Sequence, residues 1–171
     1  MLTEKCLAGI CNEVPNYPEK LAIDFVNKLK ASNSFKIFNE DLLVNTTYKS
    51  NSTHVTPLCK SREEISIPQV AKSKNGTWHY ILNPKYEAVQ RFRVEICSFN
   101  KEEKEKEISS AVQEKESSSI CADRVRNRNY EGVCVQKYVL RKMVAISGDS
   151  VFSDYFHIPS CCSCVARSYL D

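Results

Sequence analysis

The cysteines constrain the fold of this chain more than any other feature of its sequence. Nine occur in 171 residues, and usage this high indicates either an oxidising compartment or bound metal. Cys6 and Cys11 lie near the start. The others are Cys59, Cys97, Cys121, Cys134, Cys161, Cys162 and Cys164. We expect disulfides, each stabilising the fold by about 2–4 kcal/mol, to replace part of the apolar core that a small strand-rich domain lacks.

The run Cys161-Cys162-Ser163-Cys164 indicates which cysteine differs from the rest. Side chains alternate between the two faces of an extended strand, so Cys162 and Cys164 share one face and Cys161 points to the other. The remaining cysteines from Cys59 onward can pair within the chain, which leaves Cys161 over. An odd cysteine in an oxidised domain is typical of a bridge to another chain, and a free buried thiol is the alternative. We predict an intermolecular disulfide at Cys161.

Zinc binding is the competing use of these cysteines. Structural zinc sites show two cysteine pairs with C-x2–4-C spacing, whereas here only Cys161 and Cys164 provide a C-x2-C pair. His157 lies nearby in the sequence, but a single histidine beside a strand end is typical of an ordinary hydrogen-bonding side chain. We predict no metal site and no cofactor. A cytosolic cysteine-rich metal binder is the alternative.

Three N-glycosylation sequons favour an extracellular protein. They begin at Asn45, Asn51 and Asn75, and we predict that these asparagines carry glycans. The first residues show no basic start followed by an apolar run, so no signal peptide is visible. We interpret the sequence as a segment of a secreted precursor whose signal lies outside it.

Composition and motifs argue against several functional classes. The formal charge of +3 is weak for a nucleic-acid binder, and no apolar run reaches the length of about 18 residues that a membrane span requires. The sequence contains no G-x-G-x-x-G, P-loop or G-x-S-x-G motif. Its 3 histidines are not placed in a known nucleophile signature. We predict no enzymatic activity, no nucleic-acid partner and no membrane insertion.

The first part of the chain predicts one helix and a linker. Leu21, Phe25 and Leu29 recur at every fourth position, which predicts an amphipathic helix over residues 18–30. Residues 39–58 are rich in Asn, Ser and Thr, and this composition is typical of a linker.

Residues 59–171 show the pattern of β-strands. β-branched and aromatic residues with period-two alternation predict strands. The predicted strands cover residues 78–82, 89–97, 133–147 and 151–156. The last two flank the turn Gly148-Asp149-Ser150, which predicts a long hairpin. Residues 101–119 mix both charge signs with serines, which favours a solvated loop, with a short helix as the alternative.

Several of these segments resemble the active domain of the Spätzle family, secreted ligands of Toll receptors in arthropods. The most specific segment is Ile158-Pro159-Ser160-Cys161-Cys162. Further matching segments are Cys134-Val135-Gln136-Lys137-Tyr138, Arg141-Lys142-Met143-Val144-Ala145 and Val94-Glu95-Ile96-Cys97. The resemblance covers residues 59–167, and Asn16-Tyr17-Pro18 is similar to pro-regions of this family.

The resemblance implies a neurotrophin-like cystine-knot fold of twisted β-hairpins in residues 59–171. A partly helical or flexible pro-region, residues 1–58, would precede it. The implied bridges are Cys59–Cys134, Cys97–Cys162 and Cys121–Cys164. Cys161 would join two protomers into a homodimer. Cys97 and Cys121 are farther apart than in the family, so either the charged stretch between them is an insertion or Cys121 is misassigned.

The resemblance also implies a function. A Spätzle-like pro-region shields apolar strand surface until a trypsin-like serine protease cuts the precursor; the basic candidate before Cys59 is Lys49. The released dimer then binds the leucine-rich-repeat ectodomain of a Toll-type receptor in innate immune or developmental signalling. In the family, the strand around the matching tryptophan contacts the receptor, so Trp78 and Tyr80 are candidate receptor contacts, with a core position for Trp78 as the alternative. Arg124 and Arg126 lie in a basic cluster, which favours docking to an acidic receptor face, with a solvated loop as the alternative. Coagulogen, a clotting protein that shares the knot and polymerises after cleavage, offers an alternative function.

Overall fold

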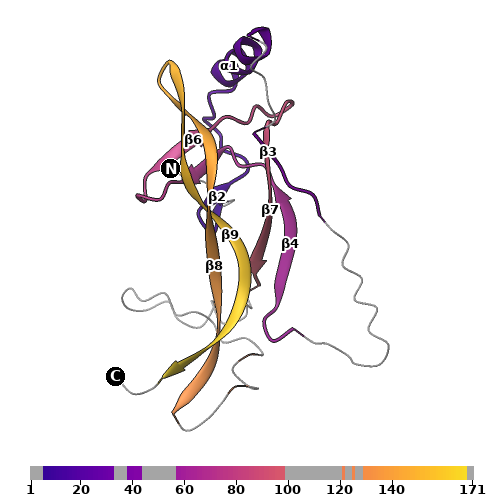
Figure 1. Ribbon diagram of the computed structural model, residues 1–171, viewed down its shortest axis with the longest axis vertical. Helices are drawn as coiled ribbons and strands as arrows, with labels where there is room; N and C mark the ends of the chain where they lie inside the picture. The colour runs from indigo at the N-terminus through magenta and orange to yellow at the C-terminus, as the bar shows by residue number, and fades with distance from the viewer. Residues whose placement is uncertain are drawn as a thin grey trace. The chain divides into compact units, whose positions relative to one another are not determined.

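The computed structural model describes residues 6–32, 38–43, 57–98, 121, 125 and 129–168. Within these ranges the chain forms mostly β-strands, together with an α-helix near the N-terminus (Figure 1). Disulfides join several of these segments. The predicted small, disulfide-rich all-β class is therefore confirmed.

The elements follow a simple order along the chain. The N-terminal part contains β1 (Cys6–Leu7), β2 (Ile10–Cys11), α1 (Glu19–Ala31) and β3 (Asn39–Glu40). The middle part contains β4 (Ser61–Ser66), β5 (Val70–Lys72), β6 (Trp78–Ile81) and β7 (Gln90–Cys97). The C-terminal part contains β8 (Tyr130–Ser147) and β9 (Ser150–Ser168). Within the described ranges, the strands are ordered β1-β2-β5-β6-β8-β9 in one sheet and β3-β7-β4 in the other.

The sequence predictions for the main elements are confirmed. Helix α1 lies where the fourfold spacing predicted it, β6 and β7 match the two predicted middle strands, and β8 and β9 form the predicted hairpin. Both hairpin strands are longer than predicted: β8 begins three residues earlier, at Tyr130, and β9 continues through the cysteine-rich residues to Ser168. At the closed end Gly148 has a φ of +52°, a conformation that favours glycine.

The chain folds into two compact units. The first, called here the helical unit, comprises residues 1–43, 64–94 and 138–159. The second, called the cystine unit, comprises residues 44–63, 95–137 and 160–171. The N-terminal residues thus belong to the same unit as strands from later in the chain. The division into a pro-region, residues 1–58, and a knot domain, residues 59–171, remains a prediction.

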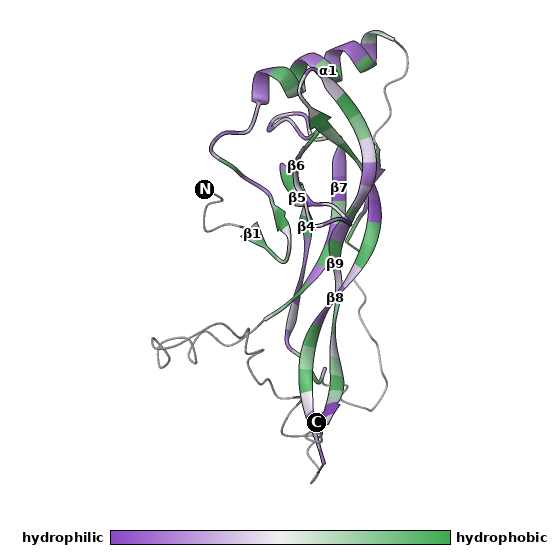
Figure 2. Cartoon of the chain, turned by 90° about the vertical axis from the view of Figure 1, so that its left-hand side faces the viewer, coloured by the Kyte–Doolittle hydropathy of each residue, from purple (hydrophilic) through white to green (hydrophobic). Residues whose placement is uncertain are grey.

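Helix α1 supplies part of the core of the helical unit. Its Ala22, Phe25 and Val26 are buried. They pack in one cluster with Leu82, Val89, Val144 and Ile146. Hydrophobic positions recur among hydrophilic ones along the helix (Figure 2), so one face packs and the other meets solvent. In the described part of the chain, no helix has the length and hydrophobicity needed to cross a membrane.

The N-terminal segment also contributes strands. Strands β1 and β2 form a small hairpin that the Cys6–Cys11 disulfide closes. Strand β2 continues the sheet by pairing Cys11 with Val70 of β5. Each added strand satisfies backbone groups that an open sheet edge would leave to solvent.

The interpretation of residues 39–58 as a linker is wrong for their beginning. Strand β3 pairs in parallel with β7, and the Asn39 side chain donates a 2.6 Å hydrogen bond to the Arg91 carbonyl. Asp41 Oδ2 accepts hydrogen bonds from the Arg93 N–H at 3.1 Å and from the Arg141 guanidinium at 2.7 Å. Polar side chains therefore anchor this segment, which a composition rule cannot foresee. Residues 44–56 lie outside the described ranges.

Two buried polar side chains connect the strands of the helical unit. Asn83 donates to the carbonyls of Pro68 and Gln90, and its Oδ1 accepts the N–H groups of Val89 and Gln90. Gln90 exchanges two hydrogen bonds with the backbone of Val144 on β8. Because buried amides are costly unless hydrogen-bonded, this network favours one register of the strands.

Candidate functional site

Three disulfides join segments of the cystine unit. They link Cys59 to Cys134, Cys97 to Cys162 and Cys121 to Cys164, with Cα–Cα distances of 5.8, 5.1 and 5.9 Å. With Cys161 left out, the first of these cysteines pairs with the fourth, the second with the fifth and the third with the sixth. These are the pairs that the resemblance to the Spätzle family implies.

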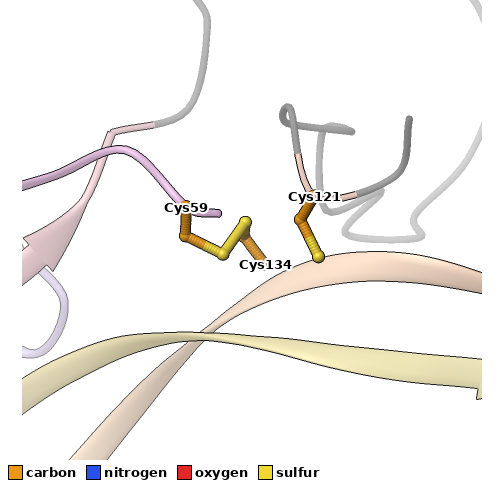
Figure 3. A group of neighbouring side chains, drawn as sticks. All are labelled: Cys59, Cys121 and Cys134. Atoms are coloured by element: carbon orange, nitrogen blue, oxygen red, sulfur yellow. A yellow bond between two sulfur atoms is a disulfide. The ribbon is translucent and has the colours of Figure 1, made fainter. Parts of the chain in front are cut away.

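Cysteines form a buried cluster in this unit. Cys59, Cys121 and Cys134 are buried, and Cys162 and Cys164 pack against them. Figure 3 shows Cys121 beside the Cys59–Cys134 disulfide. The three buried Sγ atoms lie within 4.8 Å of one another, a spacing that a metal site would also need. Zinc binds thiolates, however, and each of these sulfurs is held in a disulfide.

Gly132 of β8 allows the chain to pass close to this cluster. A Cβ at this position would lie 2.5 Å from the carbonyl oxygen of Cys121 and 2.8 Å from its Sγ. These atoms are fixed by the Cys121–Cys164 bond, so they cannot easily move away. A side chain at position 132 would therefore displace the disulfide.

Cys161 is the free cysteine of the described residues. Its side chain is half-buried, and its Sγ lies 3.6 Å from the Ser163 Oγ. Cys162, between these two residues, instead bonds to Cys97. This arrangement follows the alternation of side chains along a strand. The intermolecular disulfide at Cys161 remains a prediction.

Trp78 and Tyr80, the candidate receptor contacts, lie on β6 in the helical unit. Each side chain is 38% exposed, so Trp78 is not a core residue. The ring of His79, between them in the strand, lies edge-on to Phe152 and Phe156. A shallow pocket lies beside β6. Its lining residues are Val14, Pro15, Asn16, Val70, Trp78, His79 and Tyr80. The N-terminal segment therefore lies beside both candidate contacts.

Tyr17 connects this N-terminal segment to the end of β6 by hydrogen bonds. Its hydroxyl donates to the Ile81 carbonyl at 2.7 Å and accepts the Asn83 N–H at 2.8 Å. Its ring meets Tyr80 edge-on, with centroids 6.0 Å apart. Burial raises the pKa of the Tyr17 hydroxyl far above its ordinary value, because the phenolate would lose its hydration. The hydroxyl therefore stays protonated and donates.

We expect Tyr17→Phe to lower the free energy of unfolding by about 1–2 kcal/mol, because the Ile81 carbonyl and the Asn83 N–H lose a buried partner. Urea denaturation of the two proteins measures this difference. Tyr86→Phe is the matched control, since Tyr86 is 90% exposed, and it should change stability little. An equal loss in both variants would contradict the role of the Tyr17 hydroxyl.

The raised pKa of Tyr17 also predicts a pH dependence. A group whose pKa is higher in the folded state adds stability below its unfolded pKa, here about 10, and this contribution is lost as pH rises above that value. The advantage of the wild type over Tyr17→Phe should therefore shrink above about pH 10. Urea denaturation at neutral and alkaline pH, with Cys161→Ser in both proteins to limit exchange, tests this. A constant difference would contradict it.

Most of the other predicted site residues lie outside the described part of the chain. These residues are Asn45, Lys49, Asn51, Arg124 and Arg126. Asn75 is described and lies exposed in the turn between β5 and β6. In this turn the Ser73 N–H donates to the Thr77 carbonyl at 2.8 Å, and Gly76 has a φ of +84°. The Asn75 side chain is thus open to modification.

Sequence patterns did not single out the polar side chains that brace these sites. Gln136 bonds to backbone groups of β7 and β9 near Cys161, and Glu95 accepts the N–H of Cys162. The only sequence signal for Gln136 and Glu95 was their position within predicted strands, where a buried amide or carboxylate needs hydrogen-bond partners. The Tyr17 hydroxyl gave no separate signal beyond the similarity of Asn16-Tyr17-Pro18 to pro-regions.

Comparisons with known proteins bear on the identity of the chain. The Spaetzle family model matches residues 56–166. In Drosophila melanogaster, Protein spaetzle 5 is 26% identical over 118 residues, Protein spaetzle 25% over 168 residues and Neurotrophin 1 27% over 166 residues. These matches cover 68%, 95% and 95% of this chain, but 26%, 45% and 16% of the respective relatives. The chain thus spans less than half the length of each. Because the family model covers more than half of the sequence, the chain belongs to the Spaetzle family.

Proposed function

We propose that this chain is part of the precursor of a secreted, cytokine-like ligand. The ligand binds the leucine-rich-repeat ectodomain of a Toll-type receptor in innate immune or developmental signalling, and it acts without catalysis. The observation that carries the proposal is the interleaved set of disulfides together with a free Cys161, in a chain of the Spaetzle family.

The active form is a homodimer joined through Cys161. This cysteine has no disulfide partner within the described chain, and in an oxidising compartment a half-buried thiol can reach a second copy. A bond between the same residue of two copies lies on a twofold axis, which is the commonest symmetry of protein dimers. A single Cys161–Cys161 disulfide therefore pairs the unpaired cysteine of both copies.

The N-terminal segment shields the receptor-facing strand in the precursor. Tyr17 contacts Tyr80 and closes two hydrogen bonds at the end of β6, and Pro15 lines the pocket beside Trp78. Aromatic residues such as these are the ones most enriched at binding hot spots. While Tyr17 stays in place, a receptor cannot pack against the whole of this surface.

Cleavage in residues 44–56, at Lys49, by a trypsin-like serine protease releases the shield. The Cys6–Cys11 disulfide is local to the segment, and the knot disulfides begin at Cys59, so none of these bonds would hold the segment after the cut. A tethered segment has an effective concentration in the millimolar range, and a cut segment has only its bulk concentration. The shield therefore dissociates far more readily once the chain is cut.

Secretion would also allow N-glycosylation at Asn45, Asn51 and Asn75. Asn75 is exposed in the turn that precedes Trp78, so a glycan there is compatible with folding. Glycosylated surfaces stay in solvent, so the receptor would have to approach β6 from a direction that this glycan leaves open.

Electrophoresis with and without reductant tests the dimer. The secreted wild type should migrate at twice the monomer mass without reductant, and Cys161→Ser should migrate as a monomer. The Cys6→Ser/Cys11→Ser variant should remain a dimer, because its cysteines pair within one chain. A monomeric wild type, or a covalent dimer of Cys161→Ser, would contradict the proposal. Light-scattering polymers after cleavage would indicate a coagulogen-like protein instead.

A further inference from the structure

The peptide bond between Cys161 and Cys162 is held at both ends by side chains. The Cys161 carbonyl accepts a 3.2 Å hydrogen bond from Gln136 Nε2. The Cys162 N–H donates a 3.3 Å hydrogen bond to Glu95 Oε1. Gln136 lies on β8 and Glu95 on β7, and all four residues belong to the cystine unit. Both polar groups of one peptide bond are thus fixed by other strands.

Gln136 is itself fixed by the backbone around it. Its Oε1 accepts the Cys97 N–H at 2.9 Å, and its Nε2 lies 2.9 Å from the Glu95 carbonyl oxygen. Because a backbone N–H can donate only to the oxygen, these two contacts define the orientation of the amide. The same side chain therefore contacts the backbone of Cys97 and the peptide bond that bears its disulfide partner Cys162.

Cys161 and Cys162 are adjacent, so either of them could form the disulfide with Cys97. The Cys161 thiolate can attack the Cys97 Sγ, form a Cys97–Cys161 bond and release the Cys162 thiolate. This exchange needs no oxidant, because one disulfide replaces another and one thiolate replaces another. It requires the two neighbouring side chains to exchange faces of the strand, and such a change rotates the peptide bond between them or shifts the register by one residue.

We propose that Glu95 and Gln136 form a clamp that selects Cys162 rather than Cys161 as the partner of Cys97. A peptide bond held at its C=O and at its N–H cannot rotate without breaking both hydrogen bonds. Cys162 therefore stays directed toward Cys97, and Cys161 stays outside the knot. The clamp keeps the Cys161 thiol free for the proposed dimer, so the biological consequence of the clamp rests on the proposed function. Which cysteine pairs with Cys97 can be measured in the monomer.

Refolding at low protein concentration tests the clamp. Oxidised dithiothreitol is the oxidant: each disulfide forms from two thiols while the cyclic disulfide becomes the dithiol, leaving no stable mixed disulfide. The remaining thiol is blocked with N-ethylmaleimide, and the disulfides are then reduced and alkylated with iodoacetamide. Tandem mass spectrometry of the tryptic peptide between Lys142 and Arg167 shows whether position 161 or 162 carries the maleimide.

We expect the wild type to carry the maleimide on Cys161. In Glu95→Ala and Gln136→Leu, the ratio of label on Cys162 to label on Cys161 should rise about tenfold, since each variant removes a hydrogen bond that opposes the exchange. Glu95→Gln keeps an oxygen acceptor and should label like the wild type. Glu131→Ala is the matched control, because Glu131 is also on β8 but pairs with Arg167.

Unchanged labelling in both Glu95→Ala and Gln136→Leu would overturn the clamp, and so would an equal rise in the Glu131→Ala control. If one of the two variants does not fold, the other and the Glu95→Gln rescue still decide the question. A wild type that labels at Cys161 but never forms a covalent dimer at higher concentration would contradict the proposed function and leave the clamp intact.

Discussion

Replacing Cys97 and Cys162 together by alanine should strongly destabilise the cystine unit while the helical unit keeps its strands. The bond closes a loop of 65 residues, and the chain-entropy model assigns about 4 kcal/mol to a disulfide of this span. Small domains have a net stability of only about 5–15 kcal/mol. Cys59, Cys121 and Cys134 form a buried cluster in this unit, and Cys162 packs against it, so the double substitution also removes packing.

Hydrogen exchange measures this effect separately for each unit. Amides of residues 130–137 and 160–164 should lose most of their protection, and those of residues 70–72 and 78–81 should keep theirs. Both proteins carry Cys161→Ser, so that the free thiol cannot form a new bond with its neighbours. Urea denaturation followed by the same probes gives the change in free energy.

The Cys6→Ser/Cys11→Ser variant is the matched control. This disulfide spans only 5 residues, for which the same model gives about 2 kcal/mol, and it lies in the helical unit. Protection of residues 130–137 should therefore be unchanged. If the Cys97→Ala/Cys162→Ala variant kept its protection, disulfides would not be the main stabilising element of the cystine unit.

The elements that the sequence predicted are those with local signals. The fourfold spacing of Leu21, Phe25 and Leu29 required a helix, and Phe25 lies in its packed face. Alternation of Phe92, Val94 and Ile96 required a strand, and all three are buried on β7. In both cases the side chains that create the pattern are the ones that pack.

The partners of the N-terminal segment had no such signal. Strand β3 is only Asn39–Glu40, and this segment is held by hydrogen bonds with Arg91, Arg93 and Arg141, which are distant in sequence. A short polar segment carries no periodicity from which its neighbours could be inferred. Composition alone therefore indicated a linker.

The candidate site also has features that could be predicted from local sequence and features that could not. The strand alternation around Cys161 could be inferred from four consecutive residues, whereas the clamp depends on Glu95 and Gln136, which come from two other strands. A residue type does not reveal which backbone group its side chain will meet, so the hydroxyl of Tyr17 was equally hidden. Such contacts follow from the fold and could not be predicted before it.

Cleavage of the precursor should strengthen receptor binding by about 100-fold or more. The Tyr17 contacts and the packing of α1 hold the shield over β6, and the apparent affinity falls by the fraction of molecules whose binding surface is open. A closed state favoured by about 2.8 kcal/mol is enough for a factor of about 100. After the cut, the N-terminal segment dissociates on dilution, and the apparent affinity is no longer reduced by the closed state.

The test uses the secreted chain with a site for a specific protease introduced in the stretch that contains Lys49. Intact and cut dimers are passed over immobilised Toll-type ectodomains, and surface plasmon resonance gives the dissociation constants. Tyr17→Phe is the matched variant, because weakening the shield should increase the affinity of the intact chain and leave that of the cut chain unchanged.

Binding of the cut, disulfide-linked dimer to a Toll-type ectodomain is thus the most direct measurement of the proposed role. We predict saturable binding by the cut dimer, about 100-fold weaker binding by the intact dimer, and weaker binding by cut Cys161→Ser because a monomer has lost its second contact site. Cut dimers that bind none of the ectodomains, or intact dimers that bind as tightly as cut ones, would contradict it.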